Sequence, residues 1–526
     1  MNAFKRKYES NKTLNLLITC LTLSLISSVV FTTYVFAQTT DQSIQASKQQ
    51  AIARFQEQFC GLSSKPTSNK FISEYALPGK CELPLGVLVG DNAVWYISTK
   101  NGTLGRFDTT AKNFTEFTIP EWTARSSPVG ISQTWDIKSD SKGHIWFTDE
   151  RQNGLWSFDP QSKQFSFYKV PESSKEFGTT YPVSITFDNN QNVYFVGIRS
   201  PAIWFANTSL IKPSTSEGIS KINLSLSGFK GIPPDLVSTG SLAIDNDRHV
   251  IWVSLLAFAN KGQLLKYDIN SGNVTAFDLP KYLNSPVGIV LDHAGNPWVT
   301  DHGTSKFFRF NATDNKITEY STSPNSIISN GAVVNDAYSL PYWAKIAPDG
   351  KLWFNEHIGN KLARFDPTAS SLVEFKIPSH NKLWGGIANA LQFAIGRNNH
   401  VWFTEWTENK IAMLNSTEPL PFTANVSEDE IDLKKGDVKE IKVSLKANED
   451  VDLKLIGSST ITSTGTFGNS TTSFSQEAVT MKPGETKEIS FLFTPAQDLK
   501  AGDYTIMLGA ENDEVSYLKA VKVHIT

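Results

Sequence analysis

Histidine and carboxylate side chains stand at the ends of several short apolar runs in this sequence, namely Asp149, Glu150, Asp301, His302, Glu356, His357 and Glu405. Such side chains can bind a divalent cation or exchange a proton with a bound molecule. We predict Glu405 and Glu356 as metal ligands, and His357 or His302 as a general base. The alternative is that each one is a solvated loop residue or the satisfied partner of a neighbouring group.

The apolar runs that carry these residues are copies of one phrase. The copies are VWYIST (94–99), IWFTDE (145–150), VYFVGI (193–198), IWVSLL (251–256), PWVTDH (297–302), LWFNEH (352–357) and VWFTEW (401–406). Successive copies are roughly 50 residues apart, the length of a four-stranded β-propeller blade with its loops. One strand precedes each phrase and two follow it. The sequence therefore predicts an all-β fold with a seven-bladed β-propeller at 70–418, in which the phrase Trp and Phe fill the core between blades.

The last copy of the phrase has no fourth strand of its own, because residues after Leu414 read as a linker. The segment 71–78 (FISEYALP) has the fourth-strand pattern instead. We expect it to pair with the last blade and close the ring, which leaves no open sheet edge. Cys60 and Cys81 flank this segment, and we expect them to form a disulfide; two buried thiols are the alternative.

The two ends of the chain differ from the repeats. Basic residues precede an apolar stretch at 14–36, so 1–37 is predicted as a signal peptide or signal anchor, followed by a partly helical linker at 38–69. After about residue 425 a new alternation begins. The segments KPGET (482–486) and AGDYT (501–505) resemble immunoglobulin-like accessory domains, so we predict a β-sandwich of that type at 423–526.

The composition points to an exported protein. Sequons such as those at Asn101 and Asn273 agree with a glycoprotein that is extracellular or on the cell surface, anchored through 14–36 if that segment is retained. The formal net charge of -3, with both signs mixed, argues against nucleic acid as a partner. We expect a monomer.

The repeated phrase, with its following Asn-Lys and its "ITEF/Y, then Pro" strand, resembles the streptogramin (virginiamycin B) lyases. The match is closest at 352–378 and extends over about 71–414. This resemblance implies a carbon–oxygen lyase that uses Mg²⁺ to open a cyclic peptide lactone, with a His base and metal-bound carboxylates.

Only some of the functional positions implied by the resemblance are matched. Glu405 matches a carboxylate of the seventh blade, and Asn389 lies near the second one. Leu391 or Gln392 stands where the resemblance places the base, and Tyr342 stands at a substrate-binding His. We predict that Tyr342, Asn389 and Glu150 bind the substrate on the top face, where the first strand of each blade begins.

Two functions follow from these residues. The first is a metal-assisted lyase or hydrolase acting on an extracellular ester or lactone. The second is a non-catalytic surface protein that binds a small molecule, a peptide or a glycan on the top face of the propeller. The resemblance favours the first function, and the missing base favours the second.

Overall fold

The computed structural model describes residues 41–60, 65–173, 179–329 and 332–526. They fall into two compact units, one up to Gln56 and one from Glu57 to Thr526. The described part of the first unit is the helix α2 (Asp41–Phe55), which runs into η1 (Gln56–Cys60). The predicted signal segment at 1–37 lies outside the described residues. Within the described ranges, no helix is long and apolar enough to cross a membrane.

The second unit is all-β, as predicted, and most of it consists of four-stranded antiparallel sheets formed from consecutive strands. The first three sheets hold β2 (Pro84–Val89), β3 (Ala93–Ser98), β4 (Thr103–Asp108) and β5 (Phe114–Thr118); β6 (Ile137–Ser139), β7 (Ile145–Asp149), β8 (Gly154–Asp159) and β9 (Gln164–Lys169); and β10 (Pro182–Phe187), β11 (Val193–Gly197), β12 (Ser200–Ala206) and β13 (Ile219–Asn223).

The next three sheets have the same order of strands. They hold β14 (Val237–Asp245), β15 (Val250–Ala257), β16 (Lys261–Asp268) and β17 (Val274–Asp278); β18 (Pro286–Leu291), β19 (Pro297–Asp301), β20 (Lys306–Phe310) and β21 (Ile317–Ser321); and β24 (Pro341–Ile346), β25 (Leu352–Glu356), β26 (Lys361–Asp366) and β27 (Ser371–Lys376). The hairpin of β22 (Ser326–Ser329) and β23 (Ala332–Asn335) joins the last two of these sheets. Short 3-10 turns are η2 (Ser227–Phe229), η3 (Pro234–Leu236), η4 (Lys382–Trp384), η5 (Arg397–Asn399) and η6 (Trp406–Glu408).

One further sheet combines both ends of the repeat region. It holds β28 (Gln392–Ile395), β29 (Val401–Glu405), β30 (Lys410–Leu414) and β1 (Ile72–Ala76). Strand β1 pairs antiparallel with β30, from Ile72 opposite Leu414 to Ala76 opposite Lys410. Cys60 and Cys81, on either side of β1 in the sequence, form a disulfide with their Cα atoms 4.7 Å apart.

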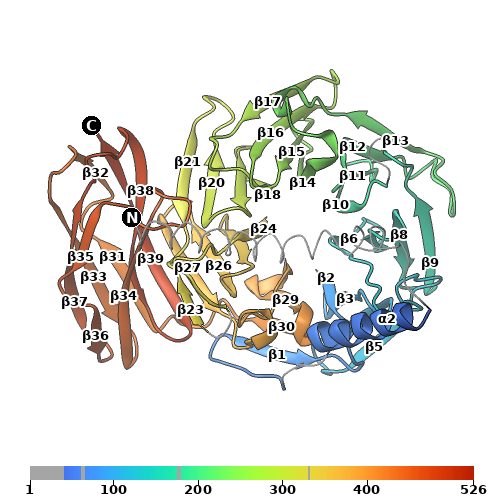
Figure 1. Ribbon diagram of the computed structural model, residues 1–526, viewed down its shortest axis with the longest axis horizontal. Coiled ribbons are helices and arrows are strands. Elements are labelled where there is room, and N and C mark those ends of the chain that lie inside the picture. Colours follow the sequence, from blue (N-terminus) through green and yellow to red (C-terminus); the bar gives the residue numbers. More distant parts are fainter. Residues whose placement is uncertain (1–40, 61–64, 174–178, 330–331) are drawn as a thin grey trace. The chain divides into compact units, whose positions relative to one another are not determined.

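The first strands of these sheets lie around a common centre (Figure 1). Each contacts the first strands of two other sheets, in the cyclic order β2, β6, β10, β14, β18, β24, β28 and back to β2. The fold is therefore propeller-like. Second strands such as β7 and β19, which carry the repeated phrase, are buried along their whole length, whereas fourth strands such as β5 and β17 are largely exposed.

The phrase aromatics fill the space between neighbouring sheets, as predicted. Phe147 packs with Ile97 and Leu104 of the preceding sheet, while Trp146 packs with Phe195 of the following sheet. Consecutive side chains of a strand point to opposite faces, so one phrase supplies both interfaces. These rings are core residues, and they do not form a surface platform for a ligand.

The C-terminal region is built from two facing sheets. One holds β31 (Phe422–Val426), β33 (Lys439–Ala447), β37 (Thr486–Thr494) and β35 (Thr471–Phe474). The other holds β36 (Ala478–Met481), β34 (Val451–Ser459), β38 (Gly502–Glu511) and β39 (Val515–Ile525), with β32 (Glu430–Leu433) parallel to β39. Strand β39 also pairs with β27, so this second sheet continues into the sheet of β24 to β27.

Candidate functional site

Neighbouring polar residues at the end of a second strand have separate environments. Asp301 closes β19 and accepts hydrogen bonds from Ser285 N and Gly303 N, both within its own sheet and loops. The next residue, His302, instead contacts the rings of Tyr342 and His357, which belong to the following sheet. Glu356 and His357 differ in the same way. The predicted set of polar residues is therefore divided into carboxylates bound inside their own sheets and side chains that contact residues of neighbouring sheets.

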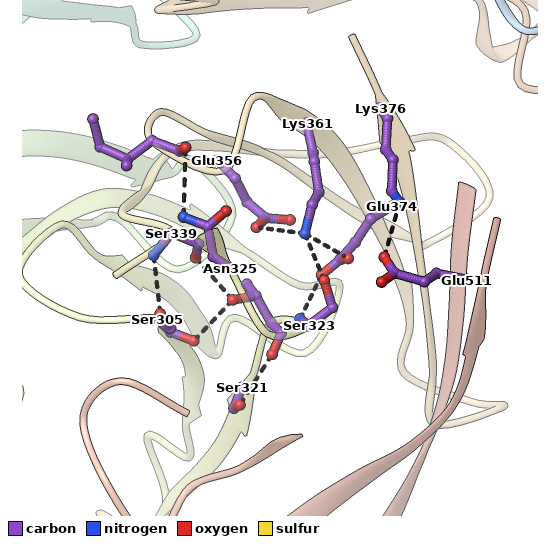
Figure 2. Close-up of polar contacts among 12 residues, drawn as sticks. Ser305, Ser321, Ser323, Asn325, Ser339, Glu356, Lys361, Glu374, Lys376 and Glu511 are labelled. Atoms are coloured by element: carbon purple, nitrogen blue, oxygen red, sulfur yellow. Dashed lines mark hydrogen bonds and ion pairs between the residues drawn. The ribbon is translucent and has the colours of Figure 1, made fainter. Parts of the chain in front are cut away.

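Glu356 lies in an ion-pair cluster inside the β24–β27 sheet (Figure 2). Lys361 is directly opposite Glu356 on the neighbouring strand, and its Nζ lies 3.8 Å from Glu356 Oε2 and 3.1 Å from Glu374 Oε2. The Ser323 hydroxyl accepts a hydrogen bond from Lys361, and the Ser323 amide donates one to Glu374. All three charged side chains are buried.

Glu405 lies in an equivalent cluster in the sheet that β1 completes. Lys410 is opposite Glu405, and its Nζ lies 2.8 Å from Glu74 Oε2 and 3.6 Å from Glu408 Oε2. Ser379 accepts a hydrogen bond from Lys410 and donates one to Glu74. A third sheet repeats the arrangement, with Lys306 opposite Asp301 and 2.7 Å from Glu319.

In the Glu356 and Glu405 clusters, more than one buried carboxylate lies near a single lysine cation. Burial raises the pKa of Glu356 well above its usual value, and the negative charge of Glu374 adds to the effect. Burial raises the pKa of Glu405 in the same way, with a further contribution from Glu74. Burial alone would raise the pKa of Glu374, but Lys361 and Ser323 outweigh it and hold that pKa below its usual value. In the β24–β27 sheet, Glu374 is therefore the carboxylate that stays ionised beside Lys361, and Glu356 is the one that more readily holds a proton.

The two predicted metal ligands do not fit a divalent cation. Glu356 and Glu405 belong to different clusters, and in each cluster a lysine ammonium group already occupies the cation's place between the carboxylates. Throughout the part of the chain that the structure describes, no three His, Cys, Asp or Glu side chains are grouped so that they could hold a metal ion. We derive no chemical step through Mg²⁺.

The predicted bases and binding residues do come together. His357 Nε2 and Asn389 Oδ1 are 3.0 Å apart, and Asn389 Nδ2 donates to Thr407 Oγ1 at 3.0 Å. With the amide oriented by Thr407, His357 donates its Nε2 proton to Asn389, so its Nδ1 carries a lone pair. The His302 ring lies parallel to that of His357, with 5.4 Å between centroids. Among the described residues, Nδ1 of His302 and of His357 have no hydrogen-bond partner, although both atoms are buried.

Aromatic side chains and one carboxylate complete this group, which we call the His302–His357 cluster (Trp135, Glu150, His302, Tyr342, His357 and Asn389). The centroid of the Tyr342 ring lies 4.3 Å from that of His302 and 5.9 Å from that of Trp135. Trp135 Nε1 donates to Glu150 Oε2 at 3.2 Å. The residues of the cluster lie in or beside strands of four different sheets, where first strands begin and second strands end.

Burial sets the protonation states in the His302–His357 cluster. It lowers the pKa of His302 to about 3, helped by the nearby His357, and lowers the pKa of His357 to about 4. Both imidazoles are therefore neutral at pH 7 and can accept hydrogen bonds. Burial raises the pKa of Glu150 to about 7, although the Trp135 hydrogen bond opposes this shift. The cluster thus presents acceptors and rings, and only a weak base.

Other features of the site were not predicted. Trp135 lies outside the repeated phrase, and no pattern marks it. The cross-strand lysines Lys306, Lys361 and Lys410 do carry a signal, because each starts the strand after a phrase whose fifth residue is an acid. Leu391, at the position implied for the base, is buried, and Gln392 donates a hydrogen bond to the Trp135 carbonyl at 2.5 Å.

The geometry of the fold can be compared with solved structures. The chain is similar to virginiamycin B lyases. The enzyme from Staphylococcus aureus gives a TM-score of 0.49 at 19% identity, over 65% of this chain and 98% of that chain. A streptogramin B lyase gives a TM-score of 0.49 at 20% identity, over 66% of this chain and 97% of that chain. YCF48 from Cyanidioschyzon merolae gives a TM-score of 0.42 at 11% identity, over 66% of this chain and 99% of that chain. No protein-family model and no curated protein matches the chain.

Proposed function

We propose that this chain is an exported binding protein, in which a seven-bladed β-propeller closed by β1 binds a peptide or glycan at the His302–His357 cluster. In this proposal the C-terminal sandwich is an immunoglobulin-like spacer, and the propeller needs no metal. The observation that carries the proposal is the pair of buried Nδ1 atoms of His302 and His357, which have no partner among the described residues.

Two buried imidazole nitrogens without partners indicate what a ligand would supply, and the Nδ1 of His357 is an acceptor because its Nε2 donates to Asn389. An unpaired buried polar atom costs about 1 to 3 kcal/mol, so a ligand that donates hydrogen bonds to these atoms recovers that free energy. Hydroxyl groups of a sugar and amide N–H groups of a peptide are such donors. The Tyr342 and Trp135 rings beside the imidazoles offer apolar faces of the kind that sugar rings and side chains pack against.

The experiment is a binding screen of the purified chain on a printed glycan array and a peptide library, followed by affinity measurements on the hits. We expect His302→Phe and His357→Phe to weaken binding of a true hit at least about tenfold, as the loss of a buried hydrogen bond requires. His293→Phe is the matched control, because His293 is exposed in the turn between β18 and β19. Hits that bind all three variants equally well would contradict the proposal.

One observation supports a second candidate function. The Asn389 side chain orients His357 so that its free Nδ1 lone pair is available, which is the arrangement of an oriented general base. The second candidate is therefore a metal-independent lyase acting on an ester or lactone. Incubation of a cyclic depsipeptide with the chain and EDTA, followed by mass spectrometry, separates the two functions. Ring opening that depends on His357 would favour the lyase, and an intact ring favours the binding protein.

A further inference from the structure

A cavity of about 610 Å³ lies where the first strands end, at the opposite end of the channel from the His302–His357 cluster. Strand β24 relates the two sites, because Tyr342 near its start belongs to the cluster, while Lys345 and Ile346 at its end line the cavity. All seven first strands contribute residues to the lining. The volume lies within the range of about 300 to 1,000 Å³ that is typical of small-molecule sites.

The wall of this cavity is mostly aliphatic. Six of the seven first strands supply apolar side chains to the lining, among them Leu88, Ile137, Ile244, Val290 and Ile346. The charged residues among the described lining residues are Lys138 and Lys345, and no carboxylate is among them. A lysine in an apolar wall loses hydration that it would have at the surface, so each of these two cations needs a compensating partner.

Lys138 has such partners. Its Nζ donates to the Ile185 carbonyl and lies 3.5 Å from Asp136 Oδ2. Asp136 Oδ2 also accepts hydrogen bonds from Ile185 N at 3.0 Å and from the Ser184 hydroxyl at 3.3 Å, and Asp136 is buried. The one carboxylate close to the two lysines is thus already engaged with Lys138 and with the chain around it.

Lys345 has no hydrogen bond or ion pair with any described residue, and its Nζ faces the Phe393 ring with 5.8 Å to the centroid. Asp136 and Lys138 are the charged groups that act on it, with opposite signs. Two cations and one carboxylate leave one positive charge uncompensated at the wall of the cavity. Burial lowers the pKa of Lys345, which agrees with an amine in need of an anionic partner.

We propose that this cavity binds a small organic carboxylate with an apolar body, whose carboxylate pairs with Lys345 Nζ while its hydrocarbon part packs against the partly exposed lining residues Leu88, Ile244 and Val290. The pairing supplies the anion that the described residues do not provide. The apolar body replaces water along an aliphatic wall, which favours binding through the hydrophobic effect. This site is separate from the peptide or glycan site, and each can fail without the other.

The test uses the full chain and decanoate as the probe, with affinity measured by isothermal titration calorimetry. Decyltrimethylammonium has the same hydrocarbon chain and the opposite charge. We expect decanoate to bind and the cation not to bind. Lys345→Met should weaken decanoate binding about tenfold or more, the usual effect of losing a charge-assisted hydrogen bond. Lys316→Met is the matched control, because the Lys316 side chain is 82% exposed on an outer turn.

A second measurement on the unaltered chain covers the case in which Lys345→Met does not fold. Acetylation by an N-hydroxysuccinimide ester is followed residue by residue by mass spectrometry, with and without decanoate. Slower labelling of Lys345 with unchanged labelling of Lys316 supports the proposal. The proposal is overturned if decanoate does not bind, if the cation binds equally well, if folded Lys345→Met retains full affinity, or if decanoate leaves the labelling of Lys345 unchanged.

Discussion

The imidazole rings of His302 and His357 lie parallel, with 8° between their planes, although each follows a different strand of a different sheet. Two charged imidazoles would repel each other at this distance, and burial already disfavours the charge of each. The pair is therefore neutral, and each ring has one unprotonated nitrogen that can accept a hydrogen bond. This property distinguishes it from a pair of histidines that changes charge near neutral pH.

Asn389 contacts His357 and adopts a left-handed backbone conformation, and both properties can be tested through the pKa of His357. Its φ of 54° is a left-handed conformation that Asn and Asp tolerate better than most residues, so Asn389→Asp preserves the backbone. The new carboxylate would face His357 Nε2 and should raise the pKa of His357 from about 4 by about 1 to 3 units. A pH titration of the His357 ring protons by NMR measures the change.

Thr407→Val is the control for the Asn389 variant. It removes the Thr407 contact to Asn389 Nδ2 without placing a charge beside His357. The pKa of His357 in Thr407→Val should stay far below its pKa in Asn389→Asp. If the pKa of His357 did not rise in Asn389→Asp, the contact between Asn389 and His357 would not exist in solution.

Glu150 should make stability depend on pH. Its pKa is about 7 in the folded chain and 4.5 when unperturbed, so between these values the folded state binds a proton that the unfolded state has released. The free energy of unfolding contributed by Glu150 therefore falls as pH rises through this window. Glu150→Gln removes the effect, and it should stabilise the chain relative to the original at pH 8 but not at pH 4.

Urea unfolding of both chains at several pH values gives the difference. Glu172→Gln is the control, because Glu172 is an exposed carboxylate on a loop. A Glu150→Gln variant whose stability difference from the original does not change between pH 4 and pH 8 would rule out the raised pKa. Other buried acids in the chain contribute equally to both proteins, so they cancel in this comparison.

Lys361→Met should be strongly destabilising. The substitution leaves Glu356 and Glu374 buried without a cation, and breaking a buried ion pair costs about 3 to 5 kcal/mol. Adding Glu374→Gln should restore part of the loss, because it removes the uncompensated charge. Thermal unfolding monitored by circular dichroism checks both variants, with exposed Lys316→Met as the control. Equal stability of Lys361→Met and Lys316→Met would show that the cluster is not a structural ion pair.

The fold could be predicted because its signal is local and repeated. Every copy of the phrase has an aromatic residue at its second position, and the burial of Trp146 and Phe147 follows from this shared register. The pattern at 71–78 also marked a strand that lacked a neighbour in the sequence, and β1 does pair with β30. Repeats that must pack against one another constrain every copy in the same way.

The site could be predicted only in part, because the side-chain direction changes at every residue of a strand. Asp301 and His302 are adjacent in the sequence, yet their side chains have no common partners. Glu356 and Glu405 form buried ion-pair clusters because of the cross-strand lysine, which is five residues further along the sequence and directly opposite in the sheet. The pairing of β27 with β39 could not be predicted, since no pattern in either strand specifies its partner.

That last pairing leads to a prediction about truncation. Residues Ser371 to Phe375 of β27 are opposite Lys519 to Val515 of β39, and Leu372 and Phe375 are fully buried. One hydrophobic cluster contains Phe354 and Leu372 together with Met507 and Leu518. The C-terminal sandwich therefore shares its core with the β24–β27 sheet. A chain that ends at residue 420 would lose this cover.

We expect the truncated chain to aggregate, because it exposes an unpaired strand edge and the apolar side chains beneath it. Size-exclusion chromatography with light scattering and binding of an anionic naphthalene dye measure the effect. Glu511→Gln is the control: it breaks the ion pairs with Lys376 and Lys454, whose side chains are 28% and 73% exposed, and should cost about 1 kcal/mol or less. A truncated chain that stays monomeric and unfolds at the original temperature would mean that the β27–β39 pairing contributes nothing to the stability of the propeller-like region.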